Sequence, residues 1–120
     1  MSSADFYGEP TLPELLQAVR EWLERDVGAT ADEATRFDAR VAANVLAMAG
    51  RELELGAEHR RHHARRLDAL GVADDRELAA LIRSGAADDR RSTVVEALWA
   101  AVHDRLAVVD PGYGRSADKA

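Results

Sequence analysis

Histidine and arginine dominate one short stretch of the sequence, HRRHHARR at residues 59–66. His59 and His63 are four residues apart, a spacing that places two imidazoles on one face of an α-helix, where they could share a metal ion. The flanking arginines would repel a divalent cation, and no carboxylate stands in the HExxH arrangement of hydrolytic zinc sites. The favoured interpretation is therefore a solvated helix surface, and a metal site is the least favoured one.

The four arginines of this stretch are the second candidate, an anion-binding patch made of Arg60, Arg61, Arg65 and Arg66. Guanidinium groups bind carboxylates and phosphates through paired hydrogen bonds, so this patch could receive an acidic protein surface or a nucleotide phosphate. The whole chain has a formal net charge of −6. That charge argues against nucleic acid as a partner, because phosphate backbones require a concentrated positive surface.

A third candidate lies in RFDARVAANVLAMAGRELELG, residues 36–56, which reads as one helix with no side clearly meant for water. At 3.6 residues per turn, one apolar face contains Phe37, Val41, Met48 and Leu55. Leu46 and Leu53 fall nearly opposite, flanked by the small residues Ala42, Ala49 and Gly50. A helix that is apolar on both sides is the central helix of a bundle, or it is half covered by a second protein.

Four polar residues interrupt that helix, and we refer to them as the polar strip: Arg40, Asn44, Arg51 and Glu52. One interpretation is structural: the arginine stems lie along apolar surface with their heads in water. Asn44 then bonds free carbonyls at the end of a neighbouring helix, and Glu52 pairs with an arginine or with the N-terminal N–H groups of another helix. The other is a docking surface, on which the arginines meet carboxylates or phosphates of a partner. The residue types leave both interpretations open.

Nothing in the sequence resembles an active site. It contains no glycine-rich phosphate loop, no GxSxG and no CxxC motif. We expect Trp22 and Trp99 to be core residues because of their helical spacing, and His103 to be a partly buried core histidine. The sequence therefore predicts a protein that is not an enzyme and that holds neither a cofactor nor a metal.

The order of elements predicts an all-α, single-domain bundle of about five helices over residues 11–110, with a flexible arm at 1–10 and a flexible tail at 111–120. The expected helices cover about 11–28, 32–55, 58–70, 74–85 and 90–109. Thr11 with Glu14 and Asp74 with Glu77 are expected N-terminal caps, and Gly28, Gly56, Gly71 and Gly85 are expected stops.

No apolar run approaches the roughly 20 residues of a membrane span, cysteine is absent, and the start lacks a signal peptide. The expected location is the cytoplasm.

The same central helix also carries a resemblance to a known family. Its run Arg36-Phe37, Arg40-Val41-Ala42, Asn44, Leu46, Arg51-Glu52 and Gly56 resembles a family of small bacterial proteins described as a domain of unknown function, DUF6285. The ending LAVVDPGYG is similar to the closing helix and the Asn-Pro-aromatic terminus of that family. Asp110 stands where the family pattern has asparagine, which puts a shared polar role of that corner in doubt. The resemblance covers roughly residues 12–113.

The resemblance implies a role beside another protein. Members of this family look like companions of aminoglycoside-phosphotransferase-like kinases, encoded near acyl-CoA dehydrogenases, and some of those kinases phosphorylate the hydroxyl of hydroxyacyl-CoA thioesters. The expected function is therefore a non-catalytic accessory subunit, while the kinase carries ATP, Mg²⁺ and the catalytic aspartate. Two alternatives stay open: a self-associating bundle whose second apolar face makes a homodimer, and a stand-alone enzyme or metal protein that uses the histidines of residues 59–63.

Overall fold

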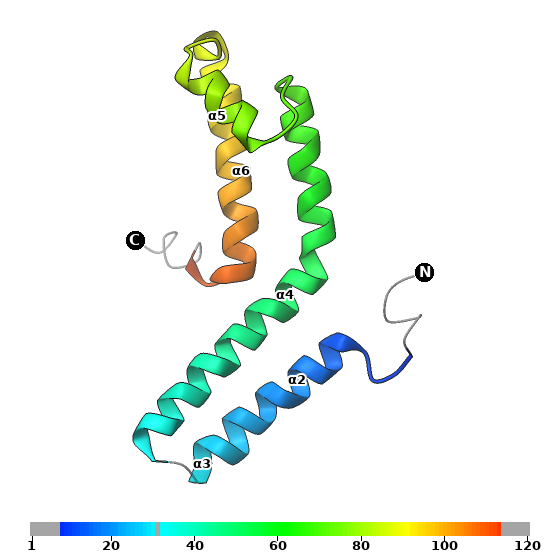
Figure 1. Cartoon of the computed structure of the whole chain (residues 1–120), viewed down its shortest axis with the longest axis vertical. Helices are drawn as coiled ribbons and strands as arrows, with labels where there is room; N and C mark the ends of the chain where they lie inside the picture. Colours follow the sequence, from blue (N-terminus) through cyan, green and yellow to red (C-terminus); the bar gives the residue numbers. More distant parts are fainter. Residues whose placement is uncertain (1–7, 31, 114–120) are drawn as a thin grey trace. The chain divides into compact units, whose positions relative to one another are not determined.

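A computed structural model of the chain describes residues 8–30 and 32–113 (Figure 1). The regular elements in these ranges are all helical, which confirms the predicted all-α class. They are α2 (Leu12–Trp22), the π-helical segment η1 (Leu23–Val27), α3 (Gly28–Thr30), α4 (Glu33–Ala69), α5 (Asp75–Arg83), the 3₁₀ segment η2 (Asp88–Arg90) and α6 (Arg91–Val109). None of these helices combines the length and apolar character needed to cross a membrane. Most of the predicted arm and tail lies outside the described residues.

The described residues contain four main helices, α2, α4, α5 and α6, where the sequence predicted about five. The difference arises because residues 33–69 form one helix of 37 residues, so the prediction that Gly56 ends a helix is wrong. Gly28 does not end its helix either, since the chain continues through η1 into α3. Glycine permits a left-handed stop but does not enforce one. The good helix formers Leu55 and Ala57 on either side of Gly56 favour continuation.

The predicted caps are confirmed. At the start of α2, the Thr11 backbone N–H donates to Glu14 Oε1 at 3.1 Å, and the Glu14 N–H donates to Thr11 Oγ1 at 3.3 Å. A further cap, not among the predicted ones, lies at the start of α4, where Asp32 Oδ1 accepts the N–H of Thr35 at 2.8 Å. Asp74 Oδ1 accepts the N–H of Glu77 at 2.9 Å at the start of α5. Each carboxylate or hydroxyl satisfies a backbone donor that has no partner within its helix.

The prediction that Gly71 stops a helix is also confirmed at the end of α4. Gly71 has a φ of 78°, which a residue with a Cβ rarely adopts. This turn lets the N–H of Val72 reach back to the carbonyl of Leu67 at 3.1 Å, the reversed bond that closes many helices. Arg90 Nη1 donates to the Leu70 carbonyl at 3.2 Å, so an arginine from η2 satisfies a carbonyl just beyond the last turn of α4.

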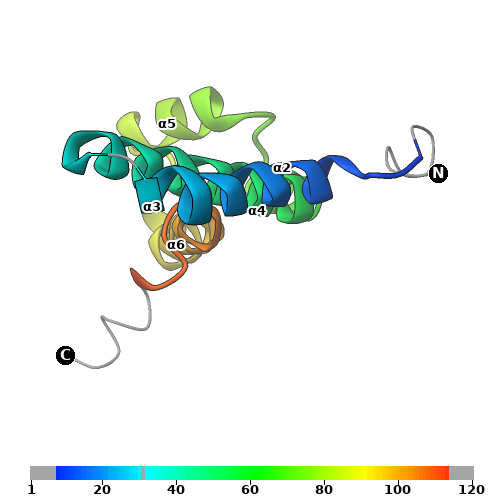
Figure 2. The same ribbon diagram turned by 90° about the horizontal axis from the view of Figure 1, so that it is seen from below.

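The chain divides into two compact units, an N-terminal unit at Met1–Glu54 and a C-terminal unit at Leu55–Ala120. The predicted single domain over 11–110 stays a prediction. In the N-terminal unit, α2 runs alongside the first part of α4 as a helical hairpin (Figures 1 and 2). Among its described residues, the buried apolar positions are Ala39 and Ala43. Two helices therefore meet here through small side chains.

The C-terminal unit has a small apolar core between the last part of α4, α5, η2 and α6. Its buried members are Leu67, Leu70, Leu78, Ala87 and Val94, with Val72, Leu81 and Ala97 packed against them. Leu78 and Leu81 of α5 thus lie at the core. Ile82, the next residue of α5, is 41% exposed.

The expectation that both tryptophans are core residues is wrong. Trp22 is 55% exposed and Trp99 is 59% exposed. On α6, the expected apolar stripe around Trp99 lies at the surface, while Val94 and Ala97 on a neighbouring face contact the core. His103 is likewise exposed and contacts the Trp99 ring, with the ring centroids 5.8 Å apart. Helical periodicity locates an apolar stripe, but it does not say which of two neighbouring stripes another helix covers.

The continuous course of α4 can be tested at Gly56. We expect Gly56→Ala to raise the free energy of unfolding by about 0.5–1 kcal/mol, because alanine loses less backbone entropy than glycine inside a helix. A Cβ at this position would lie 3.0 Å from Arg60 Nη1, the end of a flexible side chain that can move aside. Urea denaturation followed by circular dichroism measures the change.

Gly71→Ala is the matched control for that measurement. Its positive φ should make the substitution destabilising although nothing lies within 4 Å of the new Cβ. A loss of stability at Gly56 as large as the loss at Gly71 would contradict an uninterrupted α4.

The capping box of α2 predicts a pH dependence. Hydrogen bonds from the Thr11 side chain and backbone lower the pKa of Glu14 below its ordinary value of 4.5. A carboxylate with a lowered pKa stabilises the folded state above its unfolded pKa, and this contribution is lost as the pH falls through the folded pKa. Glu14→Gln should therefore lower the melting temperature at pH 7 and change it little at pH 3. Glu96→Gln, at an exposed carboxylate on α6, should show no such difference between the two pH values.

Candidate functional site

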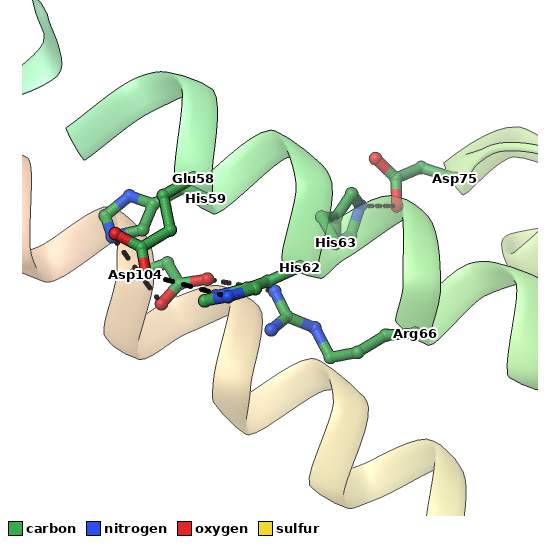
Figure 3. A network of polar contacts seen from close by, with 7 residues as sticks. All are labelled: Glu58, His59, His62, His63, Arg66, Asp75 and Asp104. Atoms are coloured by element: carbon green, nitrogen blue, oxygen red, sulfur yellow. Dashed lines mark hydrogen bonds and ion pairs between the residues drawn. The ribbon is translucent and has the colours of Figure 1, made fainter.

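Asp104 of α6 joins two basic side chains of α4 (Figure 3). Its Oδ2 lies 3.0 Å from Arg66 Nη2, and its Oδ1 lies 3.7 Å from His59 Nε2. All three side chains are largely covered, with exposures between 22% and 27%. Ion pairs that are partly shielded from water are stronger than surface pairs. We call His59, Arg66 and Asp104 the Asp104 cluster, and it fastens α4 to α6 within the C-terminal unit.

The other two histidines of the segment face other carboxylates. His63 Nε2 lies 2.8 Å from Asp75 Oδ1 at the start of α5, and His62 Nε2 lies 3.7 Å from Glu58 Oε1 one turn back on α4 (Figure 3). His59 and His63 therefore contact different helices instead of one shared ligand. In residues 8–30 and 32–113, no three His, Cys, Asp or Glu side chains are grouped so that they could hold a metal ion.

The structure separates the four arginines of the expected anion patch. Arg66 is drawn inward to Asp104, whereas Arg60, Arg61 and Arg65 are exposed. The Arg60 guanidinium lies over Gly56. Arg61 and Arg65 stand one turn apart on α4, and no ion pair joins them to another side chain in the described part of the chain. An anion site made of all four arginines would have to break the Asp104 cluster.

The polar strip lies on α4 in the N-terminal unit, and its members are not gathered at one point. Arg40 and Asn44 are exposed and line a shallow depression together with Glu24, Val41 and Ala43. Arg51 is half-buried and lines a separate depression against α2, and Glu52 is exposed. No hydrogen bond ties Asn44 to a helix end among the described residues. The bond considered for Asn44 is therefore not observed, whereas the exposed Arg40 beside the Phe37 ring is compatible with both interpretations of the strip.

Large apolar side chains flank the exposed end of this strip. Phe37, Val41 and Val45 are 58%, 48% and 56% exposed, and their four-residue spacing places them in one row. We call this row the α4 stripe. Val45 was not among the residues predicted for this apolar face, although its spacing of four residues from Val41 could have revealed it. The Arg40 guanidinium carbon lies 5.9 Å from the centre of the Phe37 ring, so the cation stacks beside the stripe.

The Asp104 cluster predicts a measurable coupling. Asp104→Asn should lower the free energy of unfolding by about 1–2 kcal/mol, because it weakens a partly buried charge-assisted hydrogen bond. In a double-mutant cycle with Arg66→Met, the two losses should not add, since both variants remove the same contact. Chemical denaturation of the four proteins measures the coupling. Asp68→Asn, at an exposed carboxylate on α4, is the control, and additive losses at Asp104 and Arg66 would contradict the contact.

A comparison with protein families finds one match to residues 29–113, described as a domain of unknown function (DUF6285). No curated protein and no solved structure matches the chain. The matched range contains α4, α5 and α6, and with them the polar strip and the Asp104 cluster, whereas α2 precedes it.

Proposed function

This chain belongs to the DUF6285 family, and on that premise we propose that it is a non-catalytic accessory subunit of an aminoglycoside-phosphotransferase-like kinase. The kinase phosphorylates hydroxyacyl-CoA thioesters, and the complex is located in the cytoplasm. The kinase carries ATP, Mg²⁺ and the catalytic aspartate, and this chain binds and stabilises it. The identity of the partner rests on the resemblance of residues 36–56 to companions of such kinases. The physical support for binding comes from the surface of α4.

The observation that carries the proposal is the α4 stripe beside Arg40. Three large apolar side chains in a row, each about half exposed, form a continuous patch that water solvates poorly. Protein interfaces combine such an apolar centre with arginine and aromatic side chains. Phe37 and Arg40 supply both and already touch each other, so little side-chain freedom is lost when a partner binds.

The surroundings of the stripe specify the chemistry of the partner surface. An apolar pocket would receive Phe37 and Val41, and a carboxylate at its rim would pair with the Arg40 guanidinium. The Asn44 amide, which offers both a donor and an acceptor, lies one turn further along α4 and can bond to partner backbone. Glu24 closes the far side of the same depression and would oppose a partner carboxylate placed too close to α2.

Co-expression with the kinase tests the proposal. The two proteins should elute together from gel filtration, and Arg40→Ala should weaken the complex by about 1–3 kcal/mol, or about 5- to 150-fold in dissociation constant. Arg61→Ala removes an equally exposed arginine from the C-terminal unit and should leave the affinity unchanged. Because both side chains are exposed, neither change should lower the melting temperature.

Separate elution of the two proteins would contradict the proposal, and so would an equal effect of both arginine substitutions. Transfer of phosphate from ATP to a hydroxyacyl-CoA by the purified chain alone would contradict its non-catalytic role.

A further inference from the structure

The helical hairpin of the N-terminal unit lacks a core of its own. Its described buried apolar residues are two alanines, Ala39 and Ala43, which bury little area. Most of the stability of a helix in a protein comes from packing an apolar face against other elements. A hairpin of this kind therefore needs a further surface that covers its larger side chains.

One such set of side chains lies along α2. Leu12, Leu15, Val19 and Trp22 are between 47% and 55% exposed, and we call them the α2 stripe. Their spacing of three, four and three residues is the pattern of a seam between helices. It is not the seam with α4, because Leu16, one position along the helix, is half-buried and lies with Leu46 and Ala47 of α4. The α2 stripe thus faces away from that contact and has no cover within the hairpin.

A matching face lies on α4. Asp38, Ala42, Ala49 and Leu53 recur at spacings of four, seven and four residues, so they share one side of the helix; we call them the α4 row. This side borders the α4 stripe, because Val45 precedes Ala49 by four residues. Ala42 and Ala49 are small and Leu53 is 49% exposed, so the row offers space for large side chains from another helix.

The large side chains of the α2 stripe and the small residues of the α4 row lie at matching heights along the hairpin. Glu24 lies with Arg40 and Asn44, whereas Pro13 lies with Arg51 and Glu54, so α2 and α4 run antiparallel. At this register, Trp22 stands level with the stretch around Ala42, and Leu15 stands level with the stretch between Ala49 and Leu53. Large side chains of α2 therefore occur at the heights at which the α4 row is small.

We propose that two copies of this chain associate through their hairpins, with the α2 stripe of each copy on the α4 row of the other. A two-fold axis parallel to the helices keeps every residue at its own height and produces an antiparallel four-helix bundle. On each copy the contact covers the four large side chains of the α2 stripe and Leu53, each about half exposed. A standard interface likewise draws more than half of its roughly 800 Å² per partner from apolar atoms.

One pair of opposite charges also favours a second copy. Arg25 is 75% exposed, and its contact with Glu21 at 3.8 Å is a surface ion pair that contributes little to stability, so its guanidinium can exchange to the exposed carboxylate of Asp38, near the same height at the start of the α4 row. The two-fold axis brings Arg25 of each copy to Asp38 of the other, so the pairing occurs twice.

Light scattering on the purified full-length chain tests the dimer. The expected mass is twice the 13.1 kDa of one chain. Val19→Glu should give the mass of a single chain, because it places a charge in the centre of the interface. Val102→Glu changes a valine on α6 that is similarly exposed, at 45%, and should leave the dimer intact. A single-chain mass for the unmodified protein, or the same effect of both substitutions, would overturn the proposal.

A charge exchange provides a second test that does not insert a charge into an apolar surface. Arg25→Glu should raise the dissociation constant of the dimer at least tenfold, and adding Asp38→Arg should restore it to within about threefold of the original value. Analytical ultracentrifugation measures these constants. If the double variant dissociates as readily as Arg25→Glu alone, the two residues do not meet and the arrangement is wrong.

The dimer and the proposed function use neighbouring sides of α4 and can fail separately. Arg40→Ala should weaken kinase binding and leave the dimer mass unchanged. A dimer that binds no kinase would contradict the proposed function alone, and a single-chain protein that binds the kinase would contradict the dimer alone.

Discussion

Small residues at the helix contacts govern how this chain distributes its apolar surface. In the N-terminal unit, Ala39 and Ala43 are the buried positions of α4, and on α6 Ala97 packs against the core beside Val94. Alanine allows two helix backbones to approach closely. Larger side chains on the neighbouring faces then cannot reach the contact and stay at the surface. The α2 stripe, the α4 stripe and the apolar stripe of α6 around Trp99 all follow from this geometry.

In the C-terminal unit, polar contacts add to the apolar core in joining the helices. Asp104 receives Arg66 and His59, and His63 reaches Asp75 on α5. These contacts occupy the imidazole and guanidinium groups involved, and a group held by a partly buried carboxylate is less available to a ligand. The residues with the richest chemistry in the sequence therefore have structural contacts. The polar groups that face solvent, Arg40 and Asn44, lie beside apolar side chains and are suited to binding another protein.

Several features could be predicted from the sequence because they depend on neighbours along the chain. The caps at Thr11 and Asp74 and the stop at Gly71 involve groups within six residues of one another. The course of α4 through Gly56 could not be predicted in this way, since glycine is compatible with either outcome. The exposure of Trp22 and Trp99 could not be predicted either, because each helix has two neighbouring apolar faces.

The sequence alone determined the helical class, the positions of most helix starts and the absence of recognisable catalytic motifs, all of which are local properties of residue type and spacing. Only the tertiary structure decided which face of each helix is covered, that Arg66 pairs with Asp104 across 38 positions of the chain, and that Phe37, Val41 and Arg40 stand together at the surface. The physical reason is that burial and charge pairing depend on which helices meet, and residue type and spacing along the chain do not specify those meetings.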